Sequence, residues 1–254
     1  MNFREVGVKA ALEAGKIMRN SFGKSQKVLL KGPRDIVTKT DEDSQRKAIG
    51  IINRHFPSHG IIAEENLDKK GLLYRWHIDP IDGTKNFFHN LPYFCISIAL
   101  EKSGEIVLGV IYDPIAKDLF VAEKGKGATL DGKRIRVRKE KNLPRAMVFY
   151  DSALHRDTKF KIHCLSSLAK KVLTIRLLGS VALDLANVSR GIGDAAIFHT
   201  PGGSWDISAG CLLVEEAGGK VTDWQGNRWH PNMKSFVASN GSIHSKLLGI
   251  LKKI

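Results

Sequence analysis

Residues 74–84 have the sequence Tyr-Arg-Trp-His-Ile-Asp-Pro-Ile-Asp-Gly-Thr, and the fold around them is decided by how this stretch begins and ends. Aromatic and β-branched residues up to Ile78 predict a strand, which Asp79 follows directly. The next residue is Pro80, which disfavours helical geometry at Asp79. We therefore expect the strand to end at Asp79 and to project its carboxylate into a loop.

The second half of the stretch predicts a turn and a helix start. Asp82 comes three residues after Asp79, Gly83 permits a turn, and Thr84 opens residues 85–89 as one or two helical turns. Free backbone N–H groups of Gly83 and Thr84 at such a start would suit a phosphate group. Taken alone, the stretch also fits a simpler interpretation, in which the two aspartates only cap a turn.

Further carboxylates weaken that simpler interpretation. Glu64 and Glu65 directly follow the apolar strand expected at 61–63, Asp41 stands at an expected helix start, and Asp206 precedes an apolar helix. Each could be a helix cap or a surface acid. A cluster of all of them would repel itself unless cations were bound, and carboxylates with a backbone carbonyl and water are ligands that Mg²⁺ prefers.

The rest of the chain predicts helix layers that cover sheets. Helical spacing marks 2–21, and the polar, lysine-rich residues 24–34 with their Gly-Pro break indicate a loop. The other expected helices are 41–56, 156–170, 181–190, 205–217 and 243–252, and the expected strands are 61–63, 74–79, 94–100, 106–112, 119–123, 128–130, 134–137, 147–150, 175–178 and 194–199. We divide the chain into an N-terminal part, 1–143, with most metal ligands, and a C-terminal part, 144–254, with the substrate pocket and the last ligand; together they form one catalytic unit.

Composition favours a cytoplasmic globular protein. The 254 residues are 43% hydrophobic, which is enough for a sizeable core. No apolar run approaches the roughly 18 residues that cross a bilayer, and the N-terminus lacks the apolar stretch of a signal peptide. The three cysteines are odd in number and widely spaced, so we expect reduced packing residues rather than disulfides or a zinc site.

Basic residues exceed acidic ones by 40 to 26, which gives a formal net charge of +14. Such an excess attracts either nucleic acid or anionic substrates. The densest basic run, 133–141, is interleaved with Ile135 and Val137 and predicts a strand with one charged face. No basic helix with interleaved aromatics supports nucleic acid, so we do not expect it as a partner, and an RNA- or transcription-associated binding protein stays the minor alternative.

Four motifs together resemble the inositol monophosphatase family. They are 79–84, the pair 205–210 (Trp-Asp-Ile-Ser-Ala-Gly) and 216–219 (Glu-Ala-Gly-Gly), the Ala-Glu-Glu of 63–65, and 35–41 (Asp-Ile-Val-Thr-Lys-Thr-Asp). They occur in the family's order and at similar spacing, and the resemblance covers essentially the whole chain. It implies an α+β fold, a layered α-β-α-β-α sandwich with two sheets, and Mg²⁺-dependent hydrolysis of small phosphate monoesters.

The resemblance also implies a metal site of two to three Mg²⁺ ions. Glu64, Asp79 and the carbonyl of Ile81 would bind one ion. Asp79, Asp82 and Asp206 would hold the second. Two metals can lower the pKa of a water, neutralise the phosphate and stabilise the leaving oxygen.

Catalytic roles follow from the same resemblance. Thr84, oriented by Asp41, would position and help to deprotonate the attacking water, and Gly83 with Thr84 would hold the phosphate. A third, looser ion would be bound by Glu64 through water, with Glu65 nearby, and Lys31, in the family's mobile loop, would help to order that ion or the substrate.

The expected substrate pocket includes Gly179, Ser180 and Asp206. Seven positions before Asp206 the family usually has an acid that contacts substrate hydroxyls, and here His199 stands there. This histidine would bind hydroxyls or a second phosphate, or it would only fill the end of a strand. Inositol monophosphate is the first substrate expected; fructose 1,6-bisphosphate, dual specificity and nucleotide or NADP phosphates are the alternatives, with Arg156, Lys159 and Arg176 as candidates for a second phosphate. The resemblance further implies a homodimer.

Overall fold

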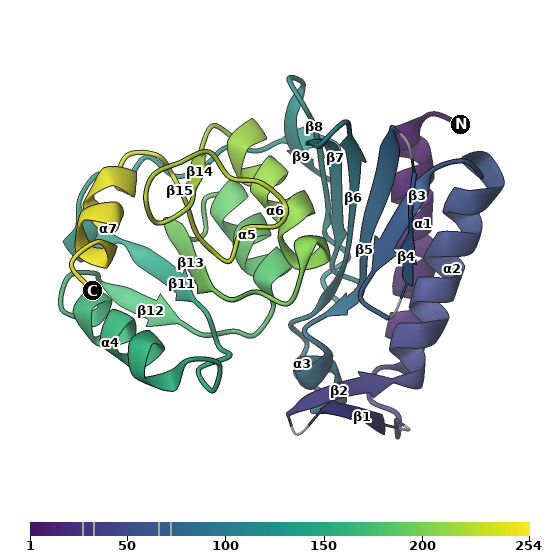
Figure 1. The fold of residues 1–254 in the computed structure, drawn as a ribbon, viewed down its shortest axis with the longest axis horizontal. Coiled ribbons are helices and arrows are strands. Elements are labelled where there is room, and N and C mark those ends of the chain that lie inside the picture. Colours follow the sequence, from purple (N-terminus) through teal and green to yellow (C-terminus); the bar gives the residue numbers. More distant parts are fainter. Residues whose placement is uncertain (27, 33, 66, 72) are drawn as a thin grey trace.

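The computed structural model describes residues 1–26, 28–32, 34–65, 67–71 and 73–254. Within them the chain forms five layers in the order helix, sheet, helix, sheet, helix, which Figure 1 shows from right to left. The α-β-α-β-α sandwich implied by the sequence motifs is therefore confirmed. Among the described residues no helix is both long and apolar enough to span a bilayer.

The first helix layer and the large sheet come from the first 134 residues. Helices α1 (Phe3–Ser21) and α2 (Lys39–His55) cover one face of this sheet. Across the sheet the strands are β10 (Lys133–Arg134), β9 (Gly127–Leu130), β8 (Leu119–Glu123), β7 (Glu105–Tyr112), β6 (Cys95–Lys102), β5 (Tyr74–Asp82), β3 (Gly60–Ala63) and β4 (Leu67–Lys69). Neighbours run antiparallel except β3 and β5, which are parallel.

The remaining layers come from the second half of the chain. The second sheet has the order β12 (Thr174–Arg176), β11 (Met147–Tyr150), β13 (Ala195–His199), β15 (Ser235–Ser239) and β14 (Lys220–Thr222). Between the sheets lie α5 (Val181–Ser189) and α6 (Ser204–Glu216), and the far face is covered by α4 (Thr158–Ala169) and α7 (His244–Leu251). Smaller elements are the hairpin of β1 (Val28–Gly32) and β2 (Asp35–Thr38), the short helix α3 (Thr84–Phe88) and a 3₁₀ turn at Leu143–Arg145.

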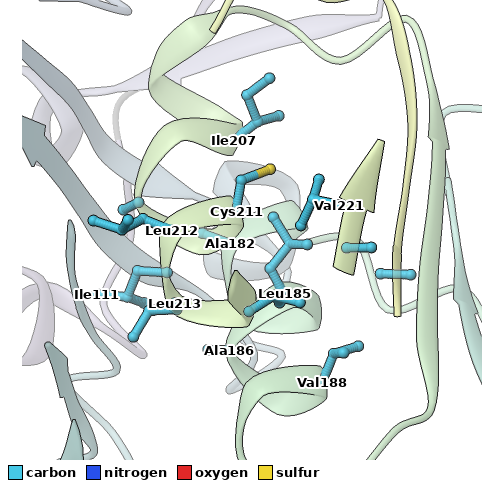
Figure 2. Close-up of a cluster of buried hydrophobic side chains, with 14 of the residues drawn as sticks. Ile111, Ala182, Leu185, Ala186, Val188, Ile207, Cys211, Leu212, Leu213 and Val221 are labelled. Carbon is cyan, nitrogen blue, oxygen red and sulfur yellow. The ribbon is translucent and has the colours of Figure 1, made fainter. Parts of the chain in front are cut away.

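Three apolar cores separate the layers, and strand alternation assigns residues to them. On β5, Trp76 and Ile78 pack against α1 and α2. His77, which lies between them in sequence, therefore faces α6. On β13, Phe198 belongs to the core between the two sheets, whereas Ile197 packs under α4 and α7. Figure 2 shows the central core, with Leu185 of α5 among the side chains of α6.

The prediction of a loop over residues 24–34 is wrong for residues 28–32. Residues 28–32 form β1, which pairs antiparallel with β2 from Val28–Thr38 to Gly32–Asp35. The Val-Leu-Leu run has strand propensity, and its lysines stay compatible with an exposed edge. Helix α2 also starts two residues before the expected Asp41, because Thr38 caps the helix and Asp41 lies in its first turn.

The strand that carries Asp79 does not end there. Strand β5 continues to Asp82, with a bulge in its pairing to β6 between Asp79 and Asp82, because Pro80 has no N–H for the ladder. The strand expected at 134–137 is limited to β10, and β4, β14 and β15 were not predicted. The division of the chain near residue 143 remains a prediction; the two sheets lie on either side of that point in sequence.

Candidate metal and phosphate site

Strand alternation places Asp79 on the face of β5 that looks toward α6. Trp76 and Ile78 are buried against α1 and α2, and His77 and Asp79 lie on the opposite face. Asp79 is only 2% exposed, and its Oδ1 accepts a hydrogen bond from the N–H of Ile81 at 3.0 Å. This bond fixes the carboxylate across the bulge.

Asp82 is the last residue of β5, and its carboxylate contacts the N-terminus of α5. Its Oδ2 accepts hydrogen bonds from the hydroxyl of Ser180 at 2.5 Å and from the N–H of Ala182 at 2.6 Å, and its Oδ1 accepts from Val181 N–H at 3.2 Å. The carboxylate thus satisfies donors at a helix N-terminus. Gly179 has a φ of 84°, which a side chain rarely adopts, so the predicted substrate pair Gly179 and Ser180 also holds Asp82.

Asp206 reaches the same place from the first turn of α6. Its Oδ2 accepts from the N–H groups of Gly202 at 2.6 Å and Gly203 at 3.3 Å. A Cβ on Gly202 would lie 2.8 Å from this oxygen, so glycine is what permits the close approach. A carboxylate has about four acceptor positions, and these bonds leave capacity for a cation.

Thr84 and Asp41 form a second, adjoining pair. The Thr84 hydroxyl lies 3.1 Å from Asp41 Oδ1 and 2.9 Å from the Ile81 carbonyl oxygen, to either of which it can donate. Asp41 is fully buried, and its Oδ2 accepts from Thr38 N–H at 2.8 Å. Burial raises the pKa of Asp41 to about 6, against the lowering effect of the Thr38 hydrogen bonds. Gly83, with a φ of 98°, makes the turn that presents Thr84.

The carboxylates of the site perturb one another. Burial, and then the charges of Glu64, Asp82 and Asp206, raise the pKa of Asp79 well above its usual range. Burial also raises the pKa of Asp82 to about 6 and that of Asp206 well above its usual range, the latter with help from Asp82 and Glu64. A folded protein that brings such acids together gains stability when a cation neutralises them.

The donor atoms of these residues suit a hard cation, but their side chains are not arranged as a complete coordination shell. In the part of the chain that the structure describes, no three His, Cys, Asp or Glu side chains are arranged to hold a metal ion as they stand. The donors available are carboxylate and carbonyl oxygens alone, which suits Mg²⁺ rather than zinc or copper. Burial first, and then the neighbouring carboxylates, raise the pKa values of Asp79 and Asp206, and a bound cation would relieve both effects.

A cavity of about 470 Å³ opens above these carboxylates. Most predicted site residues line it, together with parts of the second half of the chain. Its walls include Glu64, Asp79, Ile81, Asp82, Gly83, Thr84, Lys85, Asp151, Ser152, Arg156, Gly179, Ser180, Phe198, Thr200, Trp205 and Asp206. The structure therefore gathers the predicted metal ligands, the phosphate-binding turn and the Gly-Ser pair in one place.

Four predicted site residues, Asp41, Glu65, Lys31 and His199, lie elsewhere or are not described. Asp41 does not line the cavity, but it is hydrogen-bonded to Thr84, which does. Glu65 lies outside the lining of the cavity, but its charge raises the pKa of Asp41. Lys31 belongs to β1, and its side chain is outside what the structure describes.

His199 also lies outside the lining, although Phe198 and Thr200 on either side of it belong to the wall. Its ring centroid lies 4.8 Å from that of Phe160 and 5.4 Å from that of Trp224, and its Nε2 is 3.5 Å from an Asp157 carboxylate oxygen. Strand alternation puts this side chain on the α4 side of β13, so this conformation gives it no contact with the cavity.

Basic side chains gather at the mouth of the cavity, and we call Arg34, Lys85, His155 and Arg156 the basic rim. Lys85 and Arg156 line the cavity itself. Lost hydration lowers the pKa of His155, and the positive charges of Lys85, Arg34 and Arg156 lower it further, which places the four together. The sequence singled out only Arg156 of this group; Lys159 and Arg176 do not line the cavity.

A cavity with an acidic floor and a basic mouth suits an anionic ester held beside cations. This site on a five-layer sandwich defines the protein as a hydrolase of phosphoric monoesters.

Comparison with known proteins then gives the family. The chain belongs to the inositol monophosphatase family, whose model matches residues 2–254. It is 36% identical over 255 residues to a fructose-1,6-bisphosphatase/inositol-1-monophosphatase of Thermotoga maritima, covering 100% of this chain and 97% of the relative. Among solved structures it is similar to the extragenic suppressor protein suhB of Bartonella henselae, with a TM-score of 0.94, 36% identity and 98% of each chain covered. It is also similar to an IMPase/NADP phosphatase complexed with Mg²⁺ and phosphate, with a TM-score of 0.81, 26% identity, and 94% of this chain and 90% of the other covered.

Proposed function

We propose that the protein is a Mg²⁺-dependent phosphatase whose first substrate is inositol monophosphate. The observation that carries this proposal is that three buried aspartates, Asp79, Asp82 and Asp206, line one cavity together with Glu64. The names of its relatives support the substrate, and the solved relative with Mg²⁺ and phosphate supports the metal. We further propose two to three ions per site, a homodimer and a cytoplasmic location.

In this proposal each group of the site has one task. Glu64, Asp79, Asp82, Asp206 and the Ile81 carbonyl would hold the ions, with Glu65 near the loosest one. Bound Mg²⁺ would supply charge neutralisation of the phosphate and a lowered pKa for a water. The chain's own Thr84 hydroxyl would accept or pass a proton at Oγ, because Asp41 Oδ1 lies 3.1 Å away and can take it. The N–H groups of Gly83 and Thr84 would orient the phosphate, and Lys31 would assist from β1.

A panel of phosphate esters tests this proposal. We expect phosphate release from inositol 1-phosphate with Mg²⁺ and none after chelation. Fructose 1,6-bisphosphate, NADP and 3′-phosphoadenosine 5′-phosphate complete the panel. Absence of Mg²⁺-dependent release from every ester, with the protein folded, would overturn the proposal. RNA binding that falls steeply with salt, without hydrolysis, would instead support the minor alternative of a nucleic-acid-binding protein.

The basic rim favours a second candidate function, hydrolysis of a sugar bisphosphate. A substrate with two phosphates needs one phosphate beside the carboxylates and a cationic partner for the other, and Lys85 and Arg156 line the same cavity. In this case Arg156→Ala should lower kcat/KM on fructose 1,6-bisphosphate about tenfold and on inositol 1-phosphate much less, since each charge-assisted bond contributes about 1.5–3 kcal/mol. An equal loss on both substrates would argue against a second phosphate position at the rim.

A further inference from the structure

His77 connects the strand that carries Asp79 to the helix that carries Asp206. Its Nδ1 is 2.8 Å from the hydroxyl of Ser204, and its Nε2 is 2.7 Å from Glu101 Oε2 on β6. His77 is 2% exposed and Ser204 6% exposed, so the bond between them is shielded from water, whereas the Glu101 side chain is 22% exposed. A carboxylate oxygen accepts, so His77 Nε2 donates to Glu101, and Nδ1 forms the second hydrogen bond with the Ser204 hydroxyl.

The connection runs beside the candidate metal site. His77 precedes Asp79 by two residues on the same face of β5, and Ser204 precedes Asp206 by two residues in the first turn of α6. The hydrogen bond between His77 and Ser204 therefore spans the same gap between sheet and helix that lies between the two carboxylates.

A second hydrogen bond spans this gap on the neighbouring strand. Ser97, which pairs with Asp79 across β5 and β6, donates its hydroxyl to the carbonyl of Trp205 at 3.1 Å. The residue that follows Trp205 is Asp206. Two hydrogen bonds thus connect the start of α6 to the sheet. The His77–Ser204 bond lies two residues before Asp79 and Asp206, and the Ser97–Trp205 bond lies beside them.

We propose that His77, oriented by Glu101, is a positioning residue that fixes the separation of Asp79 and Asp206 and so sets the affinity of the site for Mg²⁺. This inference rests on the proposed function. Metal ligands must be held to within about 0.5 Å, and removal of groups that orient them typically weakens metal binding 10–100-fold. Serine, histidine and glutamate also occur in hydrolytic triads, but Ser204 does not line the cavity, so its hydroxyl meets no substrate there.

Ser204→Ala tests the proposal by removing the hydroxyl that His77 holds. Calorimetric titration of the substrate-free protein with Mg²⁺ should give a dissociation constant about tenfold higher than for the wild type. The Mg²⁺ concentration for half-maximal phosphate release should rise by the same factor, with KM for the ester unchanged at saturating Mg²⁺. Ser204→Thr, which keeps the hydroxyl, should restore wild-type binding.

Ser208→Ala is the matched control, because Ser208 is a buried serine of the same helix whose hydroxyl donates to the Ser204 carbonyl within that helix, at 2.6 Å. It should bind Mg²⁺ as the wild type does. If Ser204→Ala does not fold, Glu101→Ala takes its place, since Glu101 is partly exposed and orients His77 from outside. Wild-type affinity in the folded variant would overturn the positioning role alone, whereas a wild type that binds no Mg²⁺ would overturn the proposed function as well.

Discussion

Replacing Asp41 by asparagine should raise the stability of this protein and lower its phosphatase activity. Asp41 is fully buried, and its pKa is about 6 in the fold against 3.8 for an ordinary aspartate. A difference of about two pKa units corresponds to about 3 kcal/mol. Because the folded pKa is the higher one, the stabilising contribution is complete below pH 3.8 and is lost as the pH rises through about 6.

Asp41→Asn fixes the uncharged form at every pH. The amide oxygen can still accept from Thr38, and the amide nitrogen can donate to the Thr84 hydroxyl. In metal-free buffer at pH 8 the variant should therefore be more stable than the wild type by up to about 3 kcal/mol, and at pH 4 by less than about 1 kcal/mol. Its phosphatase activity should fall about 10²–10⁴-fold, because Thr84 loses the carboxylate that accepts its proton.

Urea unfolding in the presence of a chelator, at both pH values, measures the first effect, and phosphate release at pH 8 measures the second. Asp43→Asn is the control on the same helix. The hydrogen bond from Lys39 lowers the pKa of Asp43, whereas the pKa of Asp41 is raised. Asp43→Asn should therefore gain no stability. A loss of stability in Asp41→Asn at pH 8, or wild-type activity, would refute the assigned role of Asp41.

Other perturbations have equally direct outcomes. Lys161→Met removes the buried partner of Asp151, whose carboxylate lies 2.5 Å from the Lys161 ammonium. Urea unfolding should show a free energy of unfolding lower by about 3–5 kcal/mol. The control Lys159→Met, at an exposed position, should stay within about 0.5 kcal/mol of the wild type. Gly109→Ala should cost about 1–3 kcal/mol by the same measurement, because its Cβ would lie 2.7 Å from the Ala209 carbonyl and push α6 off the sheet; unchanged stability would show that α6 can shift freely. The rise in Tm on adding Mg²⁺ should be larger at pH 8 than at pH 5, because protons compete for carboxylates whose pKa values are raised; an equal rise at both pH values would mean that Mg²⁺ binds elsewhere.

The site residues could be predicted from the sequence because each one is tied to a local signal. Asp79 follows an apolar strand, Asp82 and Gly83 form a turn, and Asp206 begins an apolar helix, so their types and spacing mark them as candidates, and the resemblance to the family supplies their roles. Their convergence needs only the layered fold, in which β5 and the starts of α5 and α6 meet. What the spacing could not show is that Ser180 holds Asp82 instead of standing free in the pocket.

The orientation of His199 follows from the alternation of side chains along its strand. Strand β13 alternates between two cores, with Ile197 on the α4 side and Phe198 on the central side. The side chain two residues after Ile197 must share its face, so alternation alone points His199 away from the cavity. The basic rim offers no such signal, because Arg34, Lys85 and the pair His155 and Arg156 come from three separate segments that only tertiary packing brings together.

The hairpin of β1 and β2 was missed for a related reason. Lysines and a Gly-Pro break are typical of loops, yet the same features occur on exposed edge strands. Leu29 and Leu30 are 64% and 74% exposed, so the apolar pattern in this segment does not report burial. Local propensity and pairing with residues 35–38 decide its structure instead.

The most direct test of the metal-dependent phosphatase is the turnover of Asp79→Asn. Asp79 lies at the centre of the acidic floor, and the proposal has it contact both ions. The variant should fold, with a Tm in metal-free buffer equal to or above that of the wild type, because an amide removes a buried charge. Its Mg²⁺-dependent release of phosphate from inositol 1-phosphate should be abolished. Wild-type turnover by the folded variant would contradict the account.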